Sequence, residues 1–456
     1  MQKVFIKFMK ITTSQLAKII KGKLVSGDSD SLLRNVVIDS RLVKKGDIFF
    51  AIKGNNLDGH AFINKVMGSG AGAVIVSKVV KNPSAVVIQV KDTTQALGLF
   101  AAWHRQQFDI PVIAITGSVG KTTTKDYIAA TLGGKFNVLS SQKSFNNHIG
   151  VPLTLLRLQA SHKAAVVELG SNQPGDIAYL AKIVKPTIGV LTNIGASHLE
   201  KLKDQAGVAR EKLSLLKYVK STGTVIYNSD DKYLTKLKSK KMSQRRIGFS
   251  VNGISHYQAL DVKRAKKSIS FSCLTKKYTV SGHAIHNIMA ALPAIFCGEI
   301  FKCRYNTTYT NIKKVKVSSG RGRILKGSNV VIIDDTYNAN PLSFASAIES
   351  LEKYPTSQGR IVVVGDMLEL GAHKKRLHQE LGDRLAKSNV STVICFGDLA
   401  QHVAERARKN SKLNVYAYKA MPSLIKKLKL LIRSQDVVLV KGSRTMRMER
   451  VVKELI

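Results

Sequence analysis

Cysteine is scarce in this sequence, and the cysteines that occur form no pattern. There are four among 456 residues, with no C-x-x-C pair and no histidines nearby at zinc-ligand spacing. Isolated thiols of this kind argue against a disulfide framework and against a structural zinc site. We therefore expect a protein of a reducing compartment such as the cytosol. The four are Cys273, Cys297, Cys303 and Cys395.

Acidic residues are also few: 30 Asp and Glu stand against 72 Lys and Arg, which gives a formal net charge of +42. A field of this strength attracts polyanions in a salt-dependent way. The basic residues, however, are scattered through all regions, with no basic tail and no nucleic-acid-binding module, and aromatic residues make up only 6% of the chain. We therefore expect a solvated basic surface and no specific nucleic-acid ligand.

Long apolar runs are missing as well. No stretch approaches the roughly 20 apolar residues that span a bilayer, and Lys3 and Lys7 interrupt the N-terminal segment before an export signal develops. We expect no membrane span, no export and a cytoplasmic location. With 456 residues and 44% apolar content, the chain has material for about three domains of ordinary size.

Short apolar runs alternate with helical patterns along the chain, which is typical of α/β folds built on parallel sheets. We predict three domains: a small α/β domain over residues 1–106, a central parallel-sheet domain over 107–318 and a Rossmann-like domain over 319–456. The runs that predict them are 36–38, 48–51, Ala73–Val76 and 86–88; then Val112–Thr116, 164–167 and Ile188–Leu191; then 330–333, 361–364, 393–396 and 437–440.

A glycine turn between the strand Val112–Thr116 and a helix beginning at Lys121 is the most specific local signal. Such a turn points backbone N–H groups and the positive end of a helix dipole at one spot, where a phosphate can sit. Lys121 would reach the β- and γ-phosphates of ATP, and the Thr122 hydroxyl would bind Mg²⁺. The general P-loop pattern has glycine where this chain has Ile115, so the loop is shorter than usual; a turn that serves only close packing is the alternative. The predicted nucleotide-binding residues here are Gly117, Ser118, Val119, Gly120, Lys121, Thr122 and Thr123.

Ligands of parallel α/β sheets collect outside the carboxyl ends of the strands. Glu168 follows the apolar run 164–167 and is placed to hold Mg²⁺ opposite the glycine turn, unless it only caps the next turn. His198 lies in the loop after Ile188–Leu191, and Lys212 lies on a helix predicted to begin near Asp204. Neither of these two carries a signal by itself.

Three strand ends of the third domain are polar and would face one cleft. They are the sequences Asp334-Asp335-Thr336-Tyr337-Asn338-Ala339-Asn340-Pro341, Gly365-Asp366-Met367-Leu368-Glu369-Leu370-Gly371 and Lys441-Gly442-Ser443-Arg444. Consecutive acids leaving a buried strand are costly unless they meet a cation, a donor or water. The alternative is that Asp334 or Asp335 and Asp366 serve as turn and N-cap residues.

Taken together, the glycine turn 116–125, the run 334–341 and the run 441–444 resemble the Mur ligase family. The N-terminal part is similar as well, in Asp39-Ser40-Arg41 and Asp58-Gly59-His60, and so is Asn146-Asn147-His148 in the central part. The resemblance covers essentially the whole chain. It implies an N-terminal domain for a UDP-sugar, a central ATPase domain, and a C-terminal domain that closes over the site.

The resemblance also implies an activity: ATP- and Mg²⁺-dependent joining of D-alanyl-D-alanine to UDP-N-acetylmuramoyl-tripeptide, through an acyl phosphate, in peptidoglycan precursor synthesis. We expect a monomer with these two substrates as partners. Two related activities stay open: addition of an amino acid to a UDP-muramoyl peptide, and addition of glutamate to a folate. The runs 122–124 and 337–340 favour the dipeptide-adding type. A basic P-loop NTPase that binds nucleic acid would explain the charge but not the flanking motifs.

Site roles carried over from the family fall on matching positions of this chain. By that resemblance, Lys121, Glu168, His198, Lys212, Arg323 and Asp335 are catalytic, and Lys212 matches a lysine that many members carry as a carbamate. Thr122, Glu168, His198 and carbamylated Lys212 would hold metal ions. Asn287, Arg323 and Asp335 would contact the nucleotide, although alanine replaces the first asparagine of the adenine-side pattern at Ala284. Substrate-binding residues would be Ser40, Arg41, Asn146, Asn147, Tyr337, Asn338 and Asn340.

Overall fold

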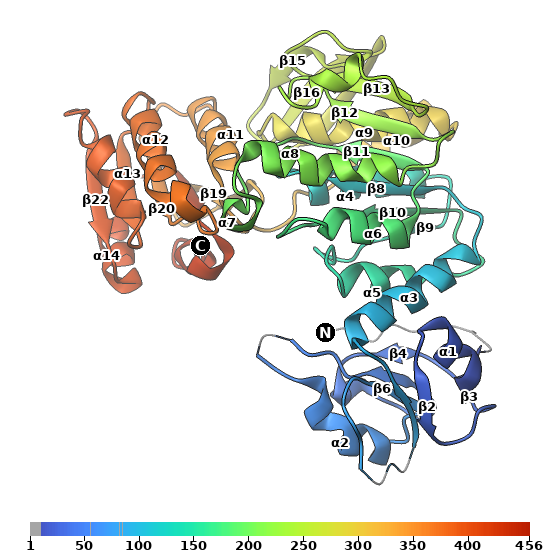
Figure 1. Ribbon diagram of the computed structural model, residues 1–456. Helices are drawn as coiled ribbons and strands as arrows, with labels where there is room; N and C mark the ends of the chain where they lie inside the picture. The colour runs from blue at the N-terminus through green and yellow to red at the C-terminus, as the bar shows by residue number, and fades with distance from the viewer. Residues whose placement is uncertain (1–10, 55, 82, 84) are drawn as a thin grey trace.

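The computed structural model describes residues 11–54, 56–81, 83 and 85–456, and it has the three-part α/β architecture that the sequence predicts. Figure 1 shows an N-terminal part at the bottom, a central part at the upper right and a C-terminal part at the left, each built around its own sheet. The residues from which we expect no export signal lie before residue 11, outside the described residues.

The N-terminal part is a five-stranded sheet of order β2-β7-β6-β5-β4, in which only β2 runs antiparallel. Its first helix is fixed by a capping box: the Thr12 side chain accepts from the backbone N–H of Gln15, and the Gln15 side chain accepts from that of Thr12. The elements are β1 (Ile11–Thr12), α1 (Thr13–Ile19), β2 (Lys23–Ser26), β3 (Leu32–Leu33), β4 (Val36–Val37), β5 (Ile48–Phe50), α2 (Ile63–Gly68), β6 (Ala73–Val76) and β7 (Val86–Gln89).

Helix α3 (Thr93–Gln106) joins this part to the central one. It packs against α5 (Gly150–Leu155) and α6 (Asp176–Val184) of the central part. The buried guanidinium of Arg105 donates to the carbonyls of Val184, Phe108 and Ile110, at 3.2, 2.6 and 3.2 Å. These contacts fix the end of α3 and the segment that follows the predicted boundary at residue 106 against the central part.

The central part is a parallel seven-stranded sheet of order β14-β13-β12-β11-β8-β10-β9. Strand β8 (Val112–Thr116) lies inside the sheet between β11 and β10, and Ile113 and Ile115 on it are fully buried. Ile115 is therefore a core strand residue, and the phosphate turn begins only after it. The other elements are α4 (Lys121–Gly133), β9 (Val138–Ser140), β10 (Ala164–Glu168), β11 (Ile188–Leu191), α7 (Leu199–Leu202), α8 (Gln205–Leu213), β12 (Thr224–Asn228), β13 (Arg245–Ser250), β14 (Tyr257–Gln258), α9 (His286–Ile300) and α10 (Tyr305–Lys314).

A three-stranded antiparallel sheet interrupts the strand and helix alternation expected over 107–318. It consists of β15 (Leu260–Arg264), β16 (Ser268–Cys273) and β17 (Lys276–Ser281). Leu274 and Thr275, with φ of 48° and 65°, make the two-residue turn between β16 and β17. Turns of this shape usually carry Asn-Gly or a similar pair, so the sequence gives no hairpin signal here.

The C-terminal part is a six-stranded sheet of order β18-β19-β23-β20-β21-β22, parallel except for β18. Because β19, β23 and β20 are neighbours, the three polar strand ends lie along one edge of the sheet, as expected. The elements are β18 (Arg323–Lys326), β19 (Val331–Asp335), α11 (Pro341–Glu352), β20 (Arg360–Gly365), α12 (Lys374–Ala386), β21 (Thr392–Phe396), α13 (Ala400–Ala407), β22 (Asn414–Tyr418), α14 (Met421–Leu431), β23 (Val437–Lys441) and α15 (Glu449–Lys453).

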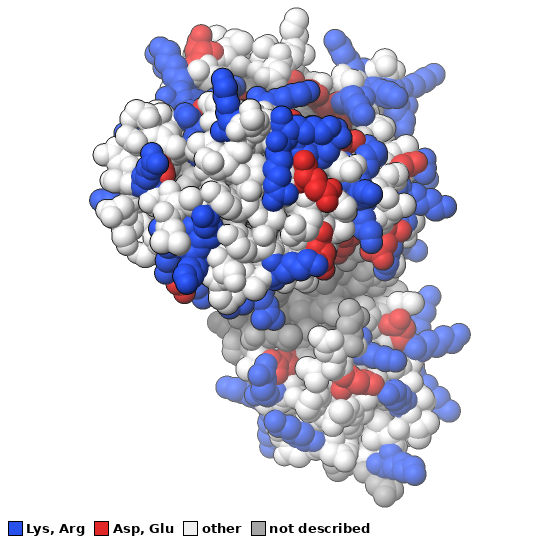
Figure 2. Space-filling view, turned by 90° about the vertical axis from the view of Figure 1, so that its left-hand side faces the viewer, with Lys and Arg blue, Asp and Glu red and all other residues white. Residues whose placement is uncertain are grey.

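Among the described helices, none combines the length and the apolar character needed to cross a membrane. Figure 2 shows Lys and Arg side chains scattered over the visible face, with fewer acidic ones between them. The positive charge is thus spread over this face and does not gather in one basic patch.

Candidate active site

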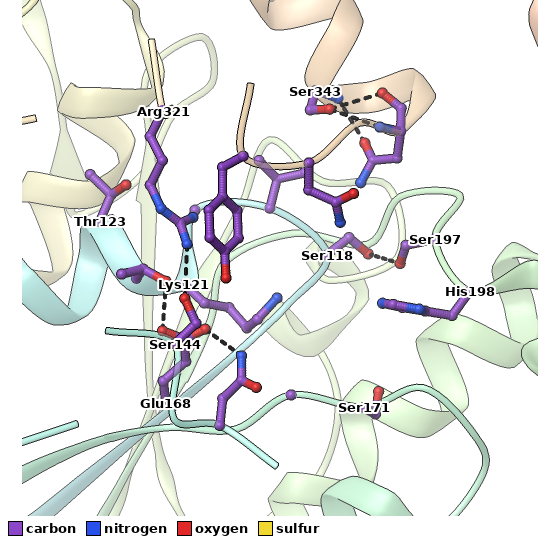
Figure 3. A pocket seen from close by; sticks show the side chains of 18 of the residues that line it. Ser118, Lys121, Thr123, Ser144, Glu168, Ser171, Ser197, His198, Arg321 and Ser343 are labelled. Atoms are coloured by element: carbon purple, nitrogen blue, oxygen red, sulfur yellow. Dashed lines mark hydrogen bonds between the residues drawn. The ribbon is translucent and has the colours of Figure 1, made fainter. Parts of the chain in front are cut away.

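A cavity of about 310 Å³ lies where the glycine turn of the central part faces the strand ends of the C-terminal part. Figure 3 shows Lys121 in its middle, Glu168 and Ser144 below, Arg321 above and His198 to one side. Both parts of the chain contribute side chains. The sequence-predicted residues among those that line it are Ser118, Val119, Gly120, Lys121, Thr122, Thr123, Asn146, Asn147, Glu168, His198, Asp335, Tyr337, Asn338 and Asn340.

The glycine turn is held in shape by the loop that follows β11. The backbone N–H of Val119 donates to Asn193 Oδ1 at 2.8 Å, and Asn193 Nδ2 donates to the carbonyl of Val119 at 3.0 Å. The Ser118 hydroxyl donates to the carbonyl of Gly195 at 3.0 Å. These bonds fix the turn directly before α4, so the first N–H groups of that helix are available to a phosphate.

Gly117 is the turn residue with the least room. Its φ is +146°, and an added Cβ would lie 2.0 Å from Thr192 Oγ1. Glycine is required here both by the backbone and by the close approach of the β11 loop.

We expect Gly117→Ala to lower the melting temperature and to abolish ATP binding, because the turn must shift to admit the methyl group. Gly133→Ala at the other end of α4 is the matched control, since nothing lies within 4 Å of its added Cβ. Differential scanning fluorimetry with and without Mg-ATP measures both effects. Equal nucleotide-induced stabilisation of the two variants would contradict this account of the turn.

Glu168 and Thr122 form the oxygen-rich floor of the cavity. The Thr122 hydroxyl donates to Glu168 Oε2 and Asn146 Nδ2 donates to Glu168 Oε1, both at 2.7 Å. Glu168 is almost fully buried at the end of β10, directly beside β8. Hydroxyl and carboxylate oxygens are the ligands that Mg²⁺ prefers, so this donor set fits the ion that the sequence predicts.

Lys121 reaches back across the turn. Its Nζ donates to the carbonyl of Gly117 at 2.8 Å. Burial lowers the pKa of Lys121, and nearby Arg321 acts in the same direction, while Glu168 opposes the shift. A partly desolvated cation that forms no ion pair with a carboxylate of the described residues is well suited to an anionic phosphate.

His198 begins α7 with a φ of 53° and lies at the junction of the central and C-terminal parts. Its Nδ1 lies 2.6 Å from Glu369 Oε2, and this hydrogen bond lowers the pKa of the Glu369 carboxyl. The expected metal ligand thus lines the cavity, but its Nδ1 is bonded to a residue of the other part of the chain.

Lys212 lies beneath the cavity on α8, with only 1% of its surface exposed. Its Nζ donates to Ser171 Oγ at 2.5 Å, and Ser171 lines the cavity. Burial, helped by the charge of Lys121, lowers the pKa of Lys212 to about 7. A substantial share of the amine is therefore neutral near pH 7, which is the form that can react with CO₂.

We expect Lys212→Met to remove a pH dependence of stability. With a pKa lowered from 10.5 to about 7, the folded chain binds fewer protons than the unfolded chain between these values. The free energy of unfolding of the wild type should therefore rise relative to the variant above pH 7, by at most about 1.4 kcal/mol per pH unit. Urea unfolding at pH 7, 8 and 9 in CO₂-free buffer measures this difference, and a constant difference would contradict the shifted pKa.

Asp335 faces the cavity from the end of β19. Its Oδ2 accepts from Lys441 Nζ at 2.6 Å, and Lys441 also donates to the carbonyl of Asn338 at 2.9 Å. Lys441 is fully buried at the end of β23. This pair fixes the loop that carries Tyr337 and Asn338 against the neighbouring strand.

Two other acids at these strand ends, Asp334 and Asp366, bind backbone N–H groups, as the alternative interpretation predicts. Asp334 accepts from the backbone N–H of Gly320 and from the Thr336 hydroxyl, at 2.9 and 2.6 Å. Asp366 accepts from the backbone N–H of Ala400 at 2.7 Å, at the start of α13.

The C-terminal part brings Arg321 into the cavity, whereas Arg323 is exposed on the edge strand β18. The Arg321 guanidinium lies 3.9 Å from the centre of the Tyr337 ring, and its Nη2 donates to Ser144 Oγ at 3.2 Å. Both arginines belong to one short Gly-Arg-Gly-Arg run, and from sequence we singled out the second.

Three further predicted residues, Asn287, Ser40 and Arg41, also lie outside the lining of the cavity. Asn287 is fully buried, and its Nδ2 donates to the carbonyl of Ser281 at 3.1 Å while its Oδ1 has no hydrogen-bond partner among the described residues. Ser40 and Arg41 belong to the N-terminal part, where Arg41 pairs with Asp39 at 2.7 Å and its hydrogen bond lowers the pKa of Asp39 to about 2.

Sequence reasoning missed several residues of the cavity. His286 precedes the predicted Asn287 and lines the cavity, and burial lowers its pKa. Lys441 stands in a motif that we noted only as a whole. Ser144 and Ser346 carry no signal, because a single serine in a loop or helix is common. Only the fold brings these side chains together.

The fold and the cavity define a class of protein: a three-part α/β enzyme in which a P-loop unit and a Rossmann-like unit face each other across a nucleotide-phosphate site. Family models agree along the chain: Mur ligase family, catalytic domain, matches residues 33–105; Mur ligase middle domain matches 115–297; and Mur ligase, glutamate ligase domain, matches 320–444. This chain belongs to the Mur ligase family.

Its relatives are similar over nearly their full length. The UDP-N-acetylmuramoyl-tripeptide--D-alanyl-D-alanine ligase of Bacillus subtilis is 33% identical, with 98% of this chain and 99% of the relative covered. The enzyme of the same name from Escherichia coli is 34% identical, with 98% of each chain covered. Among solved structures, a MurF of Acinetobacter baumannii superposes with a TM-score of 0.88 at 28% identity, covering 97% of this chain and 98% of that one. MurF of Thermotoga maritima in complex with ADP gives 0.83 at 28% identity, covering 92% and 96%.

Proposed function

We propose that this chain is an ATP-dependent ligase that joins D-alanyl-D-alanine to UDP-N-acetylmuramoyl-tripeptide in peptidoglycan precursor synthesis. The observation that carries the proposal is that Lys121 of the P-loop lines the same cavity as Asp335 and Arg321 of the C-terminal part. Two full-length relatives bear the name of this activity, and a structural relative contains ADP. The enzyme works in the cytoplasm as a monomer.

The chemistry needs activation of a carboxylate. The tripeptide carboxylate attacks the γ-phosphorus of ATP, an acyl phosphate forms and ADP leaves. The amine of the dipeptide then attacks the acyl carbon, phosphate departs and the amine loses its proton. Such transfers depend on positioning and on neutralising phosphate charge. Lys121, Arg321 and the first turn of α4 supply the positive charge.

Mg²⁺ bound here would neutralise the phosphates and orient them. Thr122 and Glu168 are the residues that would hold it, with His198 and a carbamylated Lys212 nearby. The carbamate would turn a buried amine into an anion next to the cavity, and its signal is accessible to ¹³C NMR after addition of labelled bicarbonate.

The remaining predicted residues keep their roles as part of the proposal. Ser40 and Arg41 bind the UDP-sugar, and Asn146, Asn147, Tyr337, Asn338 and Asn340 contact the substrates. Asn287 belongs to the part of the nucleotide site that holds the adenine of ATP. Arg321 takes the contact with the nucleotide that sequence matching assigned to Arg323, because Arg321 lines the cavity. The domain boundaries near residues 106 and 318 are likewise proposed.

A screen of substrate pairs tests this function against its relatives. UDP-N-acetylmuramoyl-tripeptide, UDP-muramoyl peptides of other lengths and a folate are each combined with D-alanyl-D-alanine, single amino acids or glutamate, and phosphate release is followed. We expect release only with the tripeptide and the dipeptide together. Turnover with glutamate and folate, or with a single amino acid, would assign the chain to another activity.

A further inference from the structure

One end of the central part lies far from the cavity and takes no part in the proposed function. Helices α4 and α9 both begin at the cavity, which Lys121 and His286 line, and they pack against each other. At a rise of about 1.5 Å per residue, both helices end about 20 Å from the cavity. There they meet α10 and β17. A surface at this end therefore stays accessible while substrates occupy the cavity.

Basic residues dominate this end of the central part. The three segments that form it, 132–136, 273–281 and 299–316, contain eight basic residues and one acid. The acid, Glu299, accepts a hydrogen bond from the hydroxyl of Tyr257. Six of the basic residues, which we call the basic face, are exposed and form no ion pair among the described residues. They are Lys135, Lys276, Lys277, Lys302, Arg304 and Lys313.

Hydrogen bonds between the three segments make the basic face continuous. Lys135 Nζ donates to the carbonyls of Phe301 and Lys302, at 3.0 and 3.2 Å, which joins the segment after α4 to the end of α9. The Tyr305 hydroxyl donates to the carbonyl of Lys277 at 2.6 Å, which joins the start of α10 to β17. The basic side chains of these segments therefore share one surface.

Aromatic rings lie beneath two of the ammonium groups. Lys276 Nζ lies 5.4 Å from the centre of the Tyr305 ring, and Lys313 Nζ lies 5.9 Å from that of Tyr309. Cation–π contacts of this kind orient a lysine while its charge stays in water. Aromatic residues bind single-stranded nucleic acid by stacking on the bases, and a ring face covered by an ammonium group is not free to do so. The arrangement therefore favours a layer of phosphate headgroups over a nucleic-acid strand.

We propose that the basic face docks this protein on a membrane surface rich in anionic phospholipids. A lysine or arginine near such a surface raises the affinity by about fivefold, so several on one face give reversible binding. The partly buried rings of Phe301 and Tyr305 lie among these charges, and aromatic rings are favoured at the level of the headgroups. The inference does not depend on the proposed function. A docked chain keeps its cavity turned away from the lipid.

Co-sedimentation of the full chain with lipid vesicles tests the docking surface. We expect binding to vesicles of equal parts phosphatidylglycerol and phosphatidylcholine, weakening as salt is added, and no binding to phosphatidylcholine alone. A face variant with four charges removed should bind the anionic vesicles about 10-fold more weakly or worse. It combines Lys276→Gln, Lys277→Gln, Lys302→Gln and Arg304→Gln.

A control variant removes the same number of lysines and arginines from exposed positions of the C-terminal part. Because the net charge changes equally, its affinity for the anionic vesicles should stay within about twofold of the wild type. Neither variant changes a residue that lines the cavity, so both should keep the melting temperature of the wild type. The control combines Lys375→Gln, Arg408→Gln, Lys409→Gln and Lys412→Gln.

Three results would overturn the inference. The first is a wild type that does not bind the anionic vesicles at low salt. The second is an equal loss of binding in the face variant and the control variant, which would mean that the net charge alone acts. The third is a face variant that loses binding to a single-stranded oligothymidylate but keeps its binding to the vesicles, which would assign the basic face to nucleic acid. None of these results bears on the ligase activity.

Discussion

Lys121→Ala is expected to reduce ligase turnover by about a thousandfold or more and to leave the fold intact. The Lys121 ammonium interacts in the described structure with the carbonyl of its own turn, at 2.8 Å, and with no apolar core. Its contribution is therefore made to the bound phosphates, where removal of one positioned cation typically costs about 10²-fold to 10³-fold or more. Phosphate release under saturating substrates gives the rate, and the melting temperature reports the fold.

The matched control for this variant is Lys163→Ala, which removes an exposed lysine of the same central part outside the cavity. It should retain wild-type turnover. Substantial activity of Lys121→Ala together with an unchanged melting temperature would contradict the assignment of this loop as the phosphate site.

Glu168→Gln is expected to have the second largest effect. The two buried hydrogen bonds of Glu168 are both 2.7 Å long. The glutamine side chain can replace both, because its amide oxygen accepts from Asn146 and its amide nitrogen donates to the Thr122 hydroxyl. What is lost is the negative charge in a site built from hard oxygen donors. We expect turnover to fall by about 10²-fold to 10³-fold and the Mg²⁺ concentration for half-maximal rate to rise.

A titration of Mg²⁺ at fixed ATP separates this effect from a structural one. Asp261→Asn is the control, since Asp261 is an exposed acid on β15, outside the cavity. A Glu168→Gln enzyme whose Mg²⁺ dependence matched the wild type would show that Glu168 only caps the end of β10.

Much of the central site could be predicted because its signals are local. Strand β8, the glycine turn and the start of α4 follow one another in the chain, and Glu168 ends the neighbouring strand at the level of Ile115. Strand ends of parallel sheets converge, so a polar residue after an apolar run identifies a position without knowledge of the rest of the fold. The same rule found Asp335.

What escaped prediction depends on pairings between distant segments. The contact between His198 and Glu369 joins the central part to the C-terminal part. Both residues have positive φ, a backbone conformation that a histidine or a glutamate in a sequence does not predict. Residues two apart in a strand face the same side, so spacing alone does not separate Arg321 from Arg323. Arg321 lies in the turn before β18, between Gly320 and Gly322, which both have positive φ, whereas Arg323 is the first residue of that strand. The hairpin of β16 and β17 lacks the usual turn residues.

The measurement that tests the central claim most directly is product identity under substrate omission. Purified enzyme is incubated with UDP-N-acetylmuramoyl-tripeptide, D-alanyl-D-alanine and Mg-ATP. The nucleotide products are then separated by chromatography and identified and quantified by mass spectrometry. The account predicts UDP-N-acetylmuramoyl-pentapeptide, ADP and phosphate in equal amounts, and no pentapeptide product when either peptide substrate or ATP is omitted. ATP hydrolysis without any peptide product, or formation of AMP in place of ADP, would contradict it.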